Sequence, residues 1–134
     1  MGGGHMKIKD SLTLLQYKAL ISVGCKISGN GNVIREDLPN GGSKHYFIPT
    51  ADEAIDWLRK KHNIIIYDAV EPVISIGTTK VHYRLKVKWC NKHFGYNGRV
   101  YIGSTRYASN LYALKREAVM IAVRYLKKKK NSKK

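Results

Sequence analysis

The clearest hydrophobic pattern in the chain lies at residues 80–89, where apolar and polar positions alternate without a break. The two sets are Val81, Tyr83, Leu85, Val87 and Trp89 on one side, and Lys80, His82, Arg84, Lys86 and Lys88 on the other. A period of two over this length predicts a strand of an antiparallel sheet, with its apolar face buried and its basic face in solvent.

A further strand is expected on each side of this segment. The β-branched and aromatic run at 64–67 predicts a strand before it, and Pro72 and Gly77 are expected to bound a loop or an irregular strand between the two. Residues 91–98 supply a turn, for which Asn97-Gly98 is the best local signal. Residues 99–103 follow as a third strand, with Val100 and Ile102 predicted to face inward and Arg99 and Tyr101 outward.

Helix signals stand at both ends of the chain. The pattern Thr13–Gln16 is a capping box for a helix over 12–23, and Gly24 suits the left-handed position after its last turn. A second capping box, Thr50–Glu53, opens another helix, in which Trp57 is predicted to be a core or core-rim residue.

The last helix is predicted to begin after Ser109 or Asn110 and to end in the run 127–130. Its apolar stripe consists of Leu111, Leu114, Ala118, Ile121, Ala122 and Tyr125. Between the first two helices, residues 25–48 are rich in Gly and Asn, and the short apolar pieces at 33–34 and 46–48 predict a small hairpin.

These elements predict an α+β fold: a three-stranded antiparallel sheet with helices packed on one face, in the order α-β-β-β-α, plus an N-terminal helix and hairpin. Residues 1–6 are interpreted as an expression scar and residues 7–48 as the N-terminal helix and hairpin packed on the core. The core spans residues 49–126, and residues 127–134 form a basic tail that is either solubilising or a nonspecific electrostatic arm.

Charge changes this picture, because it is placed very unevenly. The formal net charge is +16 at pH 7, and residues 73–134 contain sixteen Lys and Arg with a single acid, Glu117. A solvated surface normally mixes both signs, since like charges repel. The loss of acids from one half of the chain therefore favours an anionic partner.

Other functional classes find little support. No apolar run is long enough to span a bilayer, no signal segment follows Met6, and a cytoplasmic location is expected. Two cysteines, Cys25 and Cys90, are interpreted as free thiols, and the pair Cys90 and His93 is too small a ligand set for structural zinc. No catalytic residues, metal site or cofactor are predicted, so the protein is not expected to be an enzyme.

Three resemblances are present. The segment Thr50–Arg59 (TADEAIDWLR), with the helix at 12–23 and the alanine-bearing last helix, resembles small proteins from phages and prophages of gut bacteria, over residues 12–126. That group implies no activity, and its last helix opens with acids where this chain has 109–115 (SNLYALK). This resemblance implies a phage-encoded protein acting in a bacterial host cell.

The order α-β-β-β-α resembles double-stranded-RNA-binding domains, which use lysines at the start of the final helix. That motif is not met here, because the position offers only Arg106, with Lys115 and Arg116 further on. The segment 97–103 (NGRVYIG) with its following helix is similar to integrase arm-binding and plant-type DNA-binding domains, which lay a three-stranded sheet on the major groove. Both resemblances imply contact with a duplex.

The sequence thus predicts a nucleic-acid-binding domain that uses one sheet face to contact DNA or RNA, with a duplex favoured. The alternatives are a basic face that is merely solvated, and a protein that covers an acidic host-protein surface. Arg84 and Arg99 are candidates for bidentate contacts, and Tyr96 and Tyr101 for either stacking or structural roles. The predicted site comprises Lys80, His82, Arg84, Lys86, Lys88, Lys92, Arg99, Tyr101 and Arg106.

Overall fold

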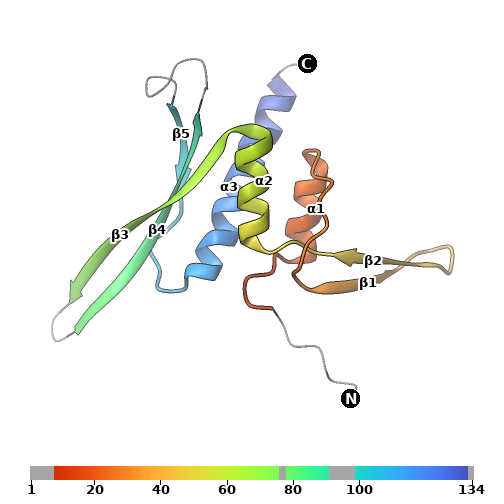
Figure 1. Ribbon diagram of the computed structural model, residues 1–134, viewed down its shortest axis with the longest axis horizontal. Helices are drawn as coiled ribbons and strands as arrows, with labels where there is room; N and C mark the ends of the chain where they lie inside the picture. The colour runs from red at the N-terminus through yellow and green to blue at the C-terminus, as the bar shows by residue number, and fades with distance from the viewer. Residues whose placement is uncertain (1–7, 76–77, 91–98, 133–134) are drawn as a thin grey trace.

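A computed structural model describes residues 8–75, 78–90 and 99–132, with the side chains of 69–82, 99 and 131–132 outside what is described (Figure 1). It is an α+β fold with three helices, a three-stranded antiparallel sheet and a two-stranded hairpin, which confirms the predicted class. The elements are α1 (Leu14–Ser22), β1 (Val33–Asp37), β2 (Ser43–Phe47), α2 (Ala51–His62), β3 (Ile64–Ser75), β4 (Thr78–Cys90), β5 (Arg99–Ser104) and α3 (Leu111–Ser132).

The helix ends follow the local sequence signals. Thr13 and Thr50 each form a complete capping box, in which the threonine hydroxyl accepts a backbone N–H and the third helical residue bonds back to the cap. Asn110 begins α3, since its side-chain oxygen accepts the N–H of Ala113 at 3.2 Å. Gly24, after α1, has a φ of +96°, the left-handed region that glycine enters without steric cost.

The hydrophobic core lies between the sheet and the helices. Both α2 and α3 pack on the same face of the sheet, and α1 packs beside α3. Leu85 and Val87 of β4 are fully buried there, together with Leu58 of α2 and Leu114 of α3. Trp57 is only 8% exposed, as predicted for a core-rim residue. Within the described part of the chain, no helix covers the opposite face of the sheet, which is called the open face below.

The first main strand is longer than its sequence signal. β3 runs for twelve residues and pairs with β4 from Ile64↔Trp89 to Ser75↔Thr78. Of the two alternatives for the segment from Pro72, the loop is wrong and a strand is present, because Pro72 lies inside β3 opposite Val81. The strand order β3-β4-β5 makes β3 an edge strand, where a residue without an N–H is tolerated. Gly77 and the turn predicted at 91–98 lie outside the described residues.

The sheet has three strands over only part of its length. β5 pairs with β4 from Lys86 to Cys90, and beyond that an isolated bridge joins Tyr83 to Ala108. The outer half of the β3–β4 hairpin is thus a two-stranded ribbon, and it projects past the helices in Figure 1. The basic strand predicted at 80–89 therefore has two parts. Its inner part pairs with both β3 and β5, and its outer part belongs to the projecting ribbon.

The last helix does not stop at the lysine run. α3 continues through residues 127–130 to Ser132, so this part of the predicted basic tail is helical. Cations in a last turn interact favourably with the carbonyl end of a helix, which is consistent with Lys129 and Lys130 at this end. None of the helices within the described ranges is both long and apolar enough to cross a membrane.

Candidate nucleic-acid interface

The open face of the sheet brings two lysines of β4 into its centre. Lys86 lies between Tyr67 of β3 and Ser104 of β5, and Lys88 lies between Ile65 and Tyr101. Directly opposed residues of an antiparallel pair share a face and contact one another. Leu85 and Val87, the neighbours of these lysines along the strand, are buried on the other face. The predicted alternation is confirmed over residues 84–88, where Leu85 and Val87 are buried and the three cations are half-buried. Tyr83 and Trp89 are also half-buried, and both pack against the core.

Aromatic rings alternate with the lysines on this open face. The ammonium of Lys88 lies 5.4 Å from the ring centroid of Tyr67, and Tyr101 is 56% exposed. A shallow cleft of about 240 Å³ is lined by Ile65, Tyr67, Lys88 and Cys90. The arrangement offers positive charge for phosphates next to flat rings on which a base can stack.

Arg84 is held in place by two residues that the sequence did not single out. Its guanidinium donates to the Ser104 hydroxyl (Nη2 to Oγ, 2.7 Å) and to the Tyr107 hydroxyl (Nη1 to Oη, 3.1 Å). The guanidinium carbon also lies 5.0 Å from the Tyr107 ring centroid. Ser104 accepts a further bond from Tyr101 at 2.8 Å, so one serine links Arg84 to the exposed tyrosine. These contacts hold the Arg84 guanidinium in one orientation on the sheet.

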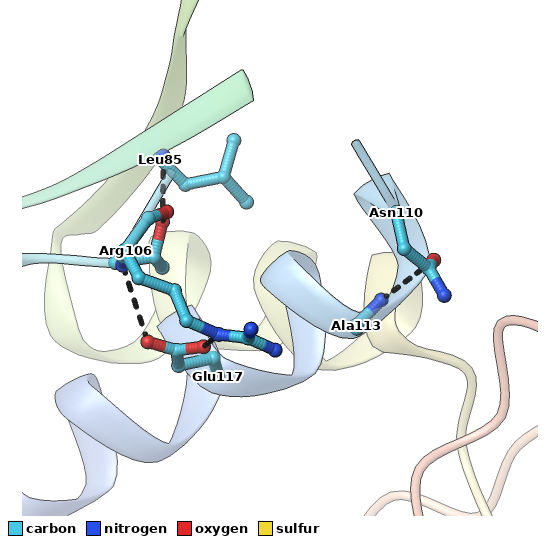
Figure 2. A network of polar contacts seen from close by, with 6 residues as sticks. Leu85, Arg106, Asn110, Ala113 and Glu117 are labelled. Carbon is cyan, nitrogen blue, oxygen red and sulfur yellow. Dashed lines mark hydrogen bonds and ion pairs between the residues drawn. The ribbon is translucent and has the colours of Figure 1, made fainter. Parts of the chain in front are cut away.

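Arg106 occupies a different place from the other predicted cations. Its Nε lies 3.1 Å from a carboxylate oxygen of Glu117, and its backbone N–H donates to the same carboxylate (Figure 2). Glu117 belongs to α3, which packs on the covered face of the sheet. The structure therefore does not bring Arg106 together with Lys86 and Lys88, and its charge is offset by the one acid of residues 73–134.

Thr105 joins the end of β5 to the middle of β4. Its hydroxyl accepts the N–H of Leu85 at 3.0 Å and donates to the carbonyl of Arg106 at 2.9 Å, while its own N–H bonds to the carbonyl of Leu85. Thr105 is only 3% exposed. The hydrogen bonds between Thr105 and Leu85 fix the backbone of β4 at the residue before Lys86.

Thr105→Val is expected to lower the free energy of unfolding by about 1–3 kcal/mol, because the buried N–H of Leu85 loses its acceptor. Urea denaturation monitored by circular dichroism measures the change. Thr105→Ser, which keeps the hydroxyl, is the matched control and is expected to lose less. Equal stability of Thr105→Val and the native protein would contradict this role.

The other predicted site residues are described only in part. Lys80 and His82 lie on β4 in the projecting ribbon, and Arg99 begins β5 opposite Cys90, but their side chains are outside the description. Lys92 lies wholly outside the described residues, as do Tyr96 and His93. The register also places an acid, Glu71, opposite His82, which the sequence did not anticipate.

Neither cysteine forms a disulfide. Cys25 is buried and Cys90 is half-buried, and both are free, as expected. Burial raises the pKa of the Cys25 thiol, which keeps it protonated and unreactive. Within the described ranges no three His, Cys, Asp or Glu side chains are grouped so as to hold a metal ion.

Comparisons with protein-family models, with curated proteins and with solved structures give no significant match.

Proposed function

We propose that this protein binds nucleic acid, with a duplex favoured, through the open face of the β3-β4-β5 sheet. The central observation is the pair of lysines, Lys86 and Lys88, flanked by Tyr67 and Tyr101. No acid stands among the described side chains that the register assigns to this face, which are Ile65, Tyr67, Arg84, Lys86, Lys88, Cys90, Tyr101 and Ser104.

Like charges at neighbouring positions of one sheet face repel each other, so this arrangement costs stability unless an anion neutralises it. Contacts of Lys86 and Lys88 with phosphates of the nucleic acid supply affinity but do not read the base sequence. Lys80, Lys92 and Arg99 are further candidates for such contacts. Arg84, already oriented by Ser104 and Tyr107, is the candidate for a bidentate contact.

The projecting ribbon supports the preference for a duplex. A two-stranded β-ribbon fits the major groove of B-form DNA, which is about 12 Å wide. The outer half of the β3–β4 hairpin has this shape, and its β4 strand contains Lys80 and His82. The three-stranded inner part of the sheet then lies against the flanking backbone of the duplex.

The test is a gel-shift titration of purified, nuclease-treated protein with double- and single-stranded DNA and RNA. We expect duplexes to bind most tightly and to be displaced by heparin, because the contacts are mainly electrostatic. Failure to shift any of the four nucleic acids at low salt would refute the proposal. A stoichiometric complex with an acidic protein that survives nuclease treatment would instead support the protein-binding alternative.

A further inference from the structure

A second basic site lies away from the open face, where the C-terminal ends of the three helices converge (Figure 1). It is a cleft of about 530 Å³, within the range typical of small-ligand sites. Its walls come from the end of α1, the end of α2, the end of β4 and the last turns of α3. The residues that line it are Val23, Gly24, His62, Trp89, Tyr125, Leu126, Lys129 and Lys130.

The described residues of the lining combine cations with aromatic rings, and none of them is an acid. The ammonium of Lys129 lies 4.6 Å from the ring centroid of Trp89 and 5.9 Å from that of Tyr125. Lys61 stands close by, since it lines an adjoining cleft that shares His62. Helix C-termini favour nearby cations in any protein, but that effect does not account for two rings in the same cleft.

We propose that this cleft binds a nucleotide, with the phosphate held by Lys129, Lys130 and His62 and the base stacked on Trp89 or Tyr125. Ammonium groups bind phosphate through charge-assisted hydrogen bonds, and aromatic side chains stack on any base. A free nucleotide and the end of a single strand both present this chemistry. The site goes beyond the proposed duplex interface, because its residues lie among the helix ends and not on the open face.

His62 gives the cleft a pH dependence that a simple lysine cluster lacks. Its ring lies edge-on to Trp57 at 5.0 Å between centroids, and it faces Lys61 of its own helix and Lys129 of α3. Burial, and then these two ammonium groups, lower the pKa of His62, so the empty site holds it neutral at pH 7. A bound phosphate favours the protonated ring, so binding takes up a proton at His62, and the contribution of His62 to affinity grows as the pH falls.

The test is a titration with 2′-deoxyadenosine 5′-monophosphate, followed by tryptophan fluorescence and by calorimetry. Lys129→Gln is expected to weaken binding about tenfold, the loss of one charge-assisted contact. Lys128→Gln is the matched control: it removes the same charge from an exposed position of the same helix that does not line the cleft, and its effect should stay within about twofold.

Two further measurements make the result decisive. Deoxyadenosine, which lacks the phosphate, should bind more weakly. The ratio of the affinity at pH 6 to the affinity at pH 8 should be lower for His62→Gln than for the native protein. The phosphate itself also titrates in this pH range. Because that titration affects both proteins equally, it cancels when the native protein is compared with His62→Gln. Equal losses in Lys128→Gln and Lys129→Gln, or no binding by the native protein, would overturn the proposal. If Lys86→Glu/Lys88→Glu loses nucleotide binding while Lys129→Gln retains it, the nucleotide binds on the open face and not in this cleft.

Discussion

Lys86→Glu/Lys88→Glu is expected to weaken duplex binding on the order of 100-fold at low salt, because two phosphate contacts become repulsive. The two lysines are the central cations of the open face and are only half-buried. The free energy of unfolding should change by less than about 0.5 kcal/mol per site, as is usual for surface substitutions. A gel-shift titration and a urea denaturation curve of the same preparation measure the two quantities.

The matched control is Lys9→Glu/Lys44→Glu, which changes the net charge equally at two exposed lysines of the N-terminal part. It should bind a duplex within a few-fold of the native protein, since contacts and not net charge alone supply the affinity. If both double variants lose affinity equally, the open face has no special role and the binding is diffuse. If neither loses affinity, the nucleic acid binds elsewhere.

Leu85→Ala is expected to lower the free energy of unfolding by about 2–5 kcal/mol, a large part of the stability of an ordinary domain. Leu85 is 1% exposed and lies where α3 packs on β4, so the shorter side chain leaves a cavity. Urea denaturation measures the change. The neighbouring variant Lys86→Ala is the control, and it should leave stability nearly unchanged while weakening duplex binding.

This pair of adjacent substitutions tests the assignment of the two faces of β4. A one-residue shift in register moves every side chain of a strand to the opposite face. If Lys86→Ala destabilises the protein as much as Leu85→Ala does, the basic positions are not on the open face.

Much of the site was predictable because its signals are local. A period of two over residues 80–89 identifies β4 and its two faces, and the capping boxes at Thr13 and Thr50 set the starts of α1 and α2. The length of β3 was not predictable, since Pro72 interrupts the strand signal and is accommodated only because β3 is an edge strand.

Contacts between segments that are distant in the chain could not be predicted from local sequence patterns. Ser104 and Tyr107 orient Arg84 across about twenty residues, and Glu117 pairs with Arg106 from another element. Arg84 therefore has structural contacts as well as charge, so its substitution mixes stability with binding. Lys86 and Lys88 give a cleaner test of function for that reason. The cleft at the helix ends likewise depends on three helices and β4 meeting in space.

The most direct measurement of the central claim is the salt dependence of duplex binding for the native protein and for Lys86→Glu/Lys88→Glu. Each phosphate neutralised by a cation contributes about 0.9 to the slope of log K against log salt concentration. The native protein should therefore show a steep negative slope, and the double variant a slope smaller in magnitude by about 2. Identical slopes for the two proteins would contradict an interface centred on the open face of the sheet.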